Sequence, residues 1–390
     1  MVIAERGALS ESSSIESQPS LLSLPSLSLH LKSSLPPLCQ CISTLKGHSS
    51  YVSGILVLGN SLYSGSSDRQ IQIWTTTPSQ SSDKTYHSGH EVIDCKSAVK
   101  SLVISGDNLF SSHQDHKIRV WRIDRHHGLR ATLPTCKDRL LSFLSPGKHV
   151  KPRRSRTRTW VYHVDVVSGL AISDDGSLLY SVSWDRSLKA WRTSDFKCIE
   201  SIPDAHHDAI NAVAVSKDGF IYTGSADMTV KVWKKLPSAK NISLVATLER
   251  HKSAVNALAL STEGTVLYSG ACDRSVVVWE GGGGGMEAVG ALRGHTKAIL
   301  CLSTMADLVC SGSADKSVRV WRRGGGDKGG GYSCLAVLEL HAGPIKSLAM
   351  LRVEPCGNET STYLVYSGSM DCDVKVWKLL VPPVGVGGDA

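Results

Sequence analysis

Histidine, serine and aspartate recur in sets that have the residue types of a serine-hydrolase triad. One set holds His206, Ser225 and Asp227, and similar sets occur along the 390-residue chain. A hydrolase needs a single site, whereas these sets repeat and each is followed by a tryptophan, such as Trp233, six residues after the aspartate. Repetition with a fixed aromatic partner favours a structural network over catalysis. We therefore expect that the protein is not an enzyme.

Other signatures of catalysis, metal binding or membrane insertion are missing from the sequence. HExxH, GxSxG and CxxC do not occur, and the glycine runs at 281–285 and 324–331 lack the spacing of a phosphate-binding loop. We expect no cofactor, no metal and no small-molecule substrate. The 11 cysteines are scattered, which indicates a reducing compartment. The start of the chain does not resemble a secretory leader, and no run approaches the ~20 apolar residues of a membrane span. We therefore expect a cytoplasmic or nuclear location.

A heptapeptide that begins with aspartate and ends with tryptophan recurs seven times. The copies are DRQIQIW (68–74), DHKIRVW (115–121), DRSLKAW (185–191), DMTVKVW (227–233), DRSVVVW (273–279), DKSVRVW (315–321) and DCDVKVW (371–377). Successive aspartates are 47, 70, 42, 46, 42 and 56 residues apart. A period in the low forties, with insertions in two intervals, is typical of a propeller array.

The elements that must position these residues are β-strands. Segments such as AINAVAVS (209–216) and AVNALALS (254–261) alternate in hydropathy, and turn sequences such as SKDG and STEG follow them. A period of two, with glycine, serine and aspartate between the segments, predicts strands, and no stretch holds a strong helical period. The sequence therefore predicts an all-β protein.

The repeats resemble the WD-repeat family over residues 39–380. This resemblance implies a single seven-bladed β-propeller with a buried network of histidine, serine, aspartate and tryptophan in each blade. A buried indole N–H and a buried carboxylate both need partners. With the serine placed two residues before the aspartate, five blades have complete tetrads: His48, Ser66, Asp68, Trp74; His163, Ser183, Asp185, Trp191; His206, Ser225, Asp227, Trp233; His295, Ser313, Asp315, Trp321; and His341, Ser369, Asp371, Trp377.

Two blades depart from this pattern. Blade five has Ala271 at the serine position. Blade two has Cys95 at the histidine position and His113 at the serine position. Because a half-filled polar network loses its cooperative value, we expect these two blades to be less rigid than the others.

The chain ends indicate how the ring closes. The segment LCQCISTLKGH (38–48) resembles the outer strand that precedes the histidine loop in other blades, so we expect it to complete the last blade. Closure removes exposed sheet edges. Residues 1–38 hold 11 Ser and 9 Leu with few charges, which predicts a disordered arm. We expect a flexible tail over 381–390.

A basic insertion at about 135–160 causes the longest interval between repeats. Six cations without an acid account for most of the net charge of +8, and they are Lys148, Lys151, Arg153, Arg154, Arg156 and Arg158. Nuclear import or contact with an acidic partner or nucleic acid is one interpretation, and a solvated loop is the other. No aromatic residues alternate with these cations, which disfavours direct nucleic-acid binding.

The insertion and two blades are also similar to the JINGUBANG group of plant WD-repeat proteins. The similar segments are ATLPTCKDRLLSFLSPGKHV (131–150), HVDVVSGLAIS (163–173), SLYSGSSDRQIQIW (61–74) and GSADKSVRVWRR (312–323). This resemblance implies a non-enzymatic plant regulator whose partners include a transcription factor. A ubiquitin-ligase receptor is an alternative, but it would need an acid directly after the tryptophan and an arginine three residues after it. None of the seven repeats has both.

Residues on one face of the propeller are the candidates for binding a protein partner. In the family, the face that carries the histidine loops and aspartate turns binds partners, and we call it the top face. The informative side chains at its contact positions are Tyr51, Lys100, Trp184, Asn211, Asn256, Lys346 and Met370. Trp184 is a candidate anchor, because strand alternation should point it away from the network that its neighbours Ser183 and Asp185 enter. Packing beneath the insertion is the other interpretation of this tryptophan.

Overall fold

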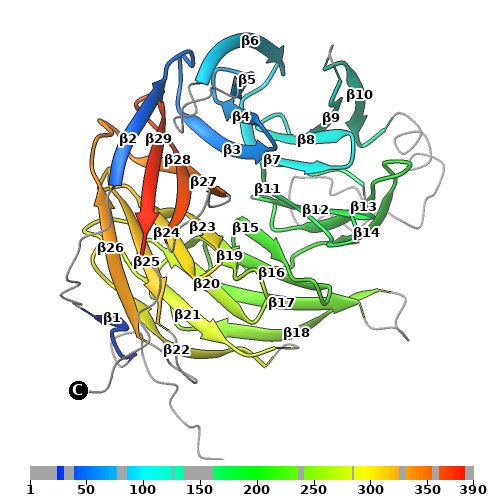
Figure 1. The fold of residues 1–390 in the computed structure, drawn as a ribbon. Coiled ribbons are helices and arrows are strands. Elements are labelled where there is room, and N and C mark those ends of the chain that lie inside the picture. The colour runs from blue at the N-terminus through cyan, green and yellow to red at the C-terminus, as the bar shows by residue number, and fades with distance from the viewer. Residues whose placement is uncertain are drawn as a thin grey trace, which may run out of the picture.

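The computed structural model describes residues 24–29, 39–76, 86–124, 127–135, 161–235, 241–282, 285–324, 331–353 and 360–382. Within these ranges the secondary structure consists of strands and contains no helix, and so no helix that could span a membrane. Seven sheets surround a common axis in the manner of a seven-bladed β-propeller (Figure 1). The all-β prediction and the number of blades are confirmed.

Blades one to three each have four antiparallel strands that run from the inner to the outer edge in chain order. They are β3 (Val52–Leu58), β4 (Ser61–Ser66), β5 (Gln70–Thr76) and β6 (Tyr86–Asp94); β7 (Val99–Ser105), β8 (Asn108–His113), β9 (Ile118–Arg122) and β10 (Leu129–Leu133); and β11 (Val167–Ile172), β12 (Leu178–Ser183), β13 (Leu188–Arg192) and β14 (Cys198–Ile202).

Blades four to six repeat this order. They are β15 (Ile210–Val215), β16 (Phe220–Ser225), β17 (Thr229–Lys235) and β18 (Ile242–Glu249); β19 (Val255–Leu260), β20 (Val266–Ala271), β21 (Val276–Glu280) and β22 (Glu287–Leu292); and β23 (Ile299–Met305), β24 (Leu308–Ser313), β25 (Val318–Arg323) and β26 (Tyr332–Leu338).

Blade seven joins the two ends of the propeller. Its first three strands are β27 (Ile345–Val353), β28 (Ser361–Ser369) and β29 (Val374–Val381). The fourth is β2 (Cys39–Leu45), which pairs antiparallel with β29 so that Cys41 lies opposite Trp377. Figure 1 shows the blue β2 beside the red β29. The prediction that an N-terminal strand closes the ring is confirmed.

The apolar core is divided among the gaps between blades. Seven buried clusters each contain one tryptophan of the heptapeptide together with residues of the preceding blade. Trp191, for example, is 1% exposed and packs with Phe110 and Ile118 of blade two. Removing such a ring typically costs about 3–5 kcal/mol of stability. The tryptophan thus fixes each blade against its neighbour.

Part of the N-terminal segment is packed on the propeller. β1 (Ser28–Leu29) pairs in parallel with β26, and the side chains of Leu24 and Leu27 are each 9% exposed. The expectation of a disordered arm over 1–38 is therefore wrong for residues 24–29, because two leucines find apolar cover between blades. The rest of that segment lies outside the described residues, as do residues 383–390 of the expected tail.

Candidate functional site

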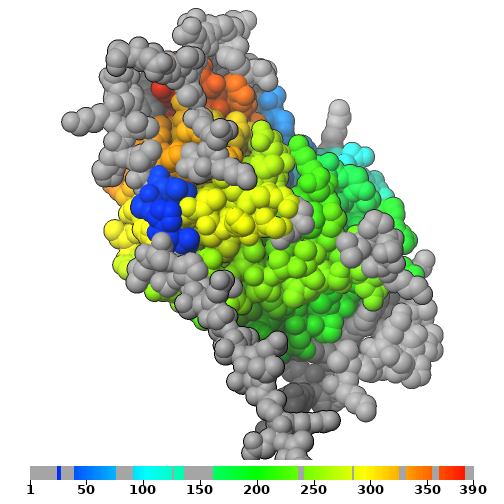
Figure 2. Space-filling view, turned by 90° about the horizontal axis from the view of Figure 1, so that it is seen from below, coloured from blue at the N-terminus to red at the C-terminus, as the bar shows by residue number. Residues whose placement is uncertain are grey.

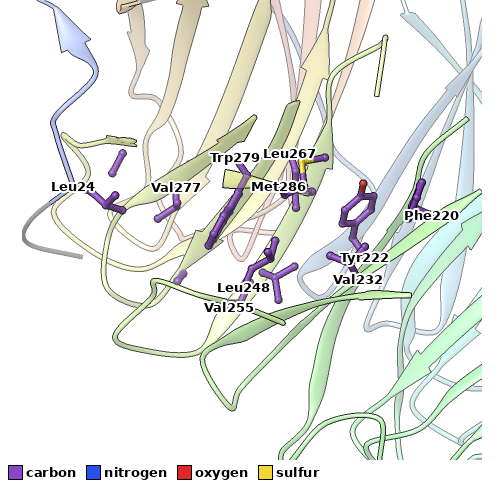
Figure 3. Packing of buried hydrophobic residues seen from close by; sticks show 13 residues of the cluster. Leu24, Phe220, Tyr222, Val232, Leu248, Val255, Leu267, Val277, Trp279 and Met286 are labelled. Carbon is purple, nitrogen blue, oxygen red and sulfur yellow. The ribbon is translucent and has the colours of Figure 1, made fainter. Parts of the chain in front are cut away.

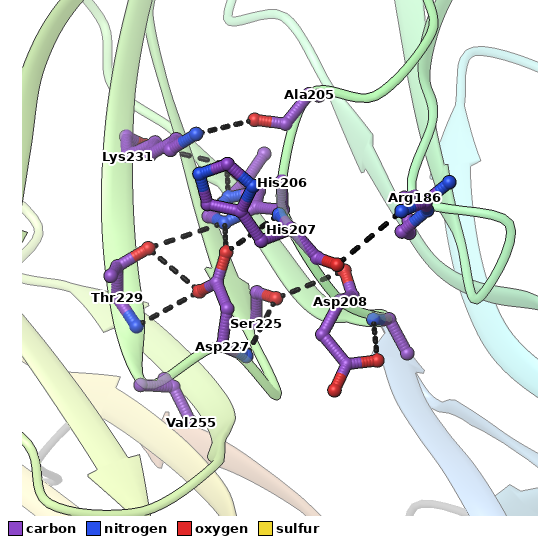
Figure 4. Close-up of polar contacts among 12 residues, drawn as sticks. Arg186, Ala205, His206, His207, Asp208, Ser225, Asp227, Thr229, Lys231 and Val255 are labelled. Carbon is purple, nitrogen blue, oxygen red and sulfur yellow. Dashed lines mark hydrogen bonds and ion pairs between the residues drawn. The ribbon is translucent and has the colours of Figure 1, made fainter.

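The polar network of blade four joins a loop, a strand and a turn (Figure 4). His206 Nδ1 lies 2.9 Å from Asp227 Oδ2, and His206 Nε2 lies 2.7 Å from Thr223 Oγ1. The indole Nε1 of Trp233 donates to the same hydroxyl over 2.8 Å. Because the indole can only donate, the hydroxyl accepts from it and can donate to a neutral imidazole, which leaves Nδ1–H to donate to the carboxylate.

This order of hydroxyl, imidazole and carboxylate is that of a hydrolase triad, but substrate cannot reach it. Thr223 is 0% and His206 1% exposed, and the hydroxyl is occupied by Trp233. Burial alone would raise the pKa of Asp227, but the hydrogen bonds from His206 and Thr229 outweigh it and hold that pKa well below its usual range. The set is therefore a charged structural link between the top loops and the blade core.

The hydroxyl of each tetrad lies four residues before the aspartate, and the sequence-based assignment two residues before it is wrong. Ser64 in blade one bonds both His48 and Trp74, whereas Ser66 bonds the carbonyl of Ser50 and the amide of Asp68. Ser183, Ser225, Ser313 and Ser369 hold loops in the same way as Ser66. The hydroxyls that reach tryptophan elsewhere are those of Ser111, Ser181, Thr223, Ser269, Ser311 and Ser367.

Blade five consequently has a complete network. His251 Nδ1 lies 2.8 Å from Asp273 Oδ2, and Ser269 bonds both His251 and Trp279. Ala271 occupies the loop-holding position, so the premise for a less rigid blade five does not hold.

Blade two builds its network from different residues. His113 Nε2 lies 2.8 Å from Ser111 Oγ, which also accepts from Trp121, so this histidine replaces the missing loop histidine. The freed Asp115 is held by Arg119, with Nη2 2.6 Å and Nη1 3.1 Å from its two oxygens. Burial, helped by the charge of Arg119, lowers the pKa of His113 to about 4. The premise of a half-filled network in blade two is therefore wrong as well.

The inner strands enclose a central cavity of about 470 Å³. Six of the seven predicted top-face residues line it: Tyr51, Lys100, Trp184, Asn211, Asn256 and Lys346. Every inner strand also contributes large aliphatic side chains to the lining: Ile55, Leu102, Leu170, Val213, Leu258, Leu300, Leu302 and Leu348. The seventh predicted residue, Met370, is 48% exposed but does not line the cavity.

The mouth of this cavity is cationic and carries an exposed aromatic ring. Lys100 and Lys346 line it, and no aspartate or glutamate is among its described lining residues. Lys100 Nζ donates to the Tyr51 hydroxyl over 2.8 Å. Although burial favours the neutral phenol, that hydrogen bond and the nearby lysine charges lower the pKa of Tyr51. Trp184 is 44% exposed and lies in the turn that follows β12, so its orientation comes from the turn and not from strand alternation.

The two asparagines also hold blades together. Asn211 Nδ2 donates to the carbonyl of Val255 over 2.9 Å, and Asn256 Nδ2 donates to that of Ile299 over 2.8 Å. Each bond crosses from one inner strand to the next. Both amides are therefore engaged within the propeller, and Lys100 is bonded to Tyr51, so Lys346 and Trp184 are the side chains best placed to contact a partner, with the charge of Lys100 beside them. The spacing of the repeats could not show that these asparagines also connect neighbouring inner strands.

Two further expectations from the sequence concern the basic insertion and the absence of a metal site. The basic insertion, with all six of its named cations, lies outside the described residues. In the part of the chain that the structure describes, no group of three or more histidine, cysteine, aspartate or glutamate residues is arranged to hold a metal ion.

The buried tetrads and the closed ring define a propeller of the WD-repeat class. Comparison with protein families matches residues 39–75, 154–192, 196–234, 242–280, 286–322 and 332–378 to the WD40 family, described as "WD domain, G-beta repeat". These segments cover more than half of the chain, which therefore belongs to the WD40 family. The unmatched stretch contains blade two, with its rearranged network. Propellers of this family generally serve as non-enzymatic scaffolds that bind other proteins.

The similar proteins share only part of their length with this chain. Myosin heavy chain kinase C of Dictyostelium discoideum is 32% identical over 158 residues, which are 38% of this chain and 19% of that protein. Transducin beta-like protein 3 of Rattus norvegicus is 29% identical over 132 residues, 30% of this chain and 16% of the relative. The matches thus span less than a fifth of each relative's length.

Proposed function

We propose that this protein is a non-enzymatic scaffold that binds an acidic segment of a protein partner at the mouth of its central cavity. The observation that carries this proposal is the arrangement of Lys100 and Lys346 beside the exposed Trp184, with no carboxylate among the described lining residues. A carboxylate on the partner would pair with the lysines. Trp184 would supply the apolar contact area that dominates many interfaces.

We also propose a biological role, a kind of partner and a location in the cell. The similarity to the JINGUBANG group supports a regulatory protein of plants that acts through a signalling or transcription-factor partner, in the cytoplasm, the nucleus or both. The basic insertion would serve nuclear import. Most of the insertion, up to residue 153, lies outside the matched family segments, whereas its last residues fall within the segment 154–192.

A peptide-selection experiment tests the binding site with random sequences in place of the natural partner. The peptides are selected on the full chain and then measured on Lys346→Glu, on Trp184→Ala and on Leu244→Ala. Leu244 is 47% exposed on the outer strand β18 and is the matched control. We expect the selected peptides to be rich in aspartate and glutamate and to lose affinity for the first two variants only. Peptides without acidic bias, or equal binding to Trp184→Ala, would refute the proposal.

The second candidate is a nucleic-acid-associated factor that uses the basic insertion. Six cations within residues 148–158 favour it. If this function holds, deleting residues 148–158 abolishes nucleic-acid binding whose affinity falls steeply with salt, because each neutralised phosphate releases counterions. A top-face scaffold would keep its acidic-peptide binding after the same deletion.

A further inference from the structure

The outer edge of blade five is covered by a short segment of the same chain. Residues 24–29, which we call the strap, cross the outer strand β22 and continue along β26 of blade six. Figure 2 shows the dark-blue strap against the yellow surface of blade five. Outer strands of propellers present unpaired backbone groups, so a covering strand satisfies them.

The strap is held on both sides by backbone hydrogen bonds. Leu27 N donates to the carbonyl of Ala291 over 3.1 Å, and Ala291 N donates back to the carbonyl of Pro25 over 3.0 Å. Tyr332 N donates to the carbonyl of Leu27 over 2.8 Å. The strap therefore acts as an added strand between β22 and β26, which is how extended peptides dock on sheet edges.

Two leucines, three residues apart, enter different gaps between blades. Leu24 joins the cluster between blades four and five that contains Val277 and Trp279 (Figure 3). Leu27 joins the cluster between blades five and six that contains Trp321 and Tyr332. One short segment thereby connects three blades.

The groove is shaped for Leu27. A Cβ on Gly290 would lie 2.5 Å from Leu27 Cγ, so only glycine leaves room for this leucine beside β22. The matching position of blade six is Ala336, which has the Cβ that Gly290 lacks. With the strap in place, Ala291 is 0% exposed, whereas Val337, its counterpart in blade six, is 41% exposed. Blade five therefore has room for a leucine beside Gly290, which we call the recess, and blade six lacks it because Ala336 takes this position.

We propose that this recess is a peptide-binding site, separate from the top face, for an extended segment with leucines three residues apart. In the resting chain its occupant is the strap itself. Tethering gives the strap an effective concentration near the millimolar range, so a site of modest affinity stays filled. Occupancy of the recess fastens blades four, five and six to one another.

Backbone amide exchange in the full chain tests occupancy by the strap. The amides of Ala291 and Tyr332 donate to the strap. We expect them to be protected in the wild type and to exchange at least ~10-fold faster in Leu24→Ser/Leu27→Ser, with amides of β24 unchanged. Gly290→Val should displace the strap by filling the groove, and should speed the exchange of the same two amides. Gly128→Ala is its control, because a Cβ there meets nothing within 4 Å.

A peptide added in trans tests the recess itself. The sequence 20–32 (SLLSLPSLSLHLK), added at up to ~1 mM to Leu24→Ser/Leu27→Ser, should restore protection of Ala291 and Tyr332 in a saturable manner. The same peptide carrying Leu27→Ser should not. Unprotected amides in the wild type, no recovery with the peptide, or leucine-dependent dimerisation, which would show that a second copy supplies the strap, would each overturn the proposal.

Discussion

Two neighbouring residues in the turn after β12 have different roles in this propeller. Asp185 is drawn into the network of blade three, where Val164 N donates to its Oδ2 over 2.8 Å. Trp184, one position earlier, points to the cavity and is 44% exposed. Both residues lie in the turn between β12 and β13, so the turn directs one side chain into the network and the other to the cavity. Strand alternation does explain the misplaced hydroxyl: Ser64 and Ser66 lie on the same face of β4, so the sequence could not show which of them reaches the tryptophan.

The histidine of blade two should make stability depend on pH. The pKa of His113, about 4, lies below the ordinary value of 6.5, so folding favours its neutral form. Its contribution is complete above pH 6.5 and is lost as the pH falls towards 4. Between pH 7 and pH 5 we expect the wild type to lose about 2 kcal/mol more than His113→Gln in urea titrations. Parallel pH profiles for the two proteins would show that this histidine does not titrate as inferred.

The carboxylate of blade two should matter as much as those of the regular blades. Asp115→Ala would leave the guanidinium of Arg119, whose side chain is 7% exposed, without its partner. We expect a loss on the order of 2–3 kcal/mol, similar to that of Asp227→Ala, in thermal or urea unfolding. Arg119→Leu in the Asp115→Ala background should recover most of it. Failure of that second change to restore stability would argue against the pairing.

At the scale of elements, closure of the ring rests on one strand from the far end of the chain. β2 pairs with β29 from Cys39 to Leu45, and Leu45 joins the cluster between blades seven and one. The strand thus supplies both backbone pairing and part of a core. Its role could be predicted because the segment before His48 matches the strand that precedes the histidine loop in other blades.

Removing the closing strand should therefore open the ring. We expect a chain that lacks residues 39–46 to aggregate or to lose cooperative unfolding, because β29 becomes an exposed edge. Size-exclusion chromatography with calorimetry measures both properties. Deletion of residues 1–34 is the control, and it should lower the melting temperature by only a few degrees through loss of the strap. A monomeric, cooperative 47–390 chain would contradict the closure.

At the scale of the molecule, the sequence predicts the seven similar blades but not the features in which single blades differ. Periodicity along the chain was enough to predict the fold, since each heptapeptide marks a turn and a strand. The substitution of Arg119 for a histidine partner was not predictable, because it joins residues that only the turn geometry brings together. The strap was missed for another reason: residues 24–29 are too short to show a strand period, and the residues that bury their leucines belong to blades four, five and six.

The affinity of a selected acidic peptide for the wild type and for Trp184→Ala tests the central claim most directly. An interface anchor of this kind is typically worth about 2 kcal/mol or more, so we expect the dissociation constant to rise roughly thirtyfold while the melting temperature stays the same. Leu244→Ala should bind as the wild type does. Unchanged affinity of Trp184→Ala, with a melting temperature several degrees lower, would show that this tryptophan is a packing residue and would contradict a partner site at the cavity mouth.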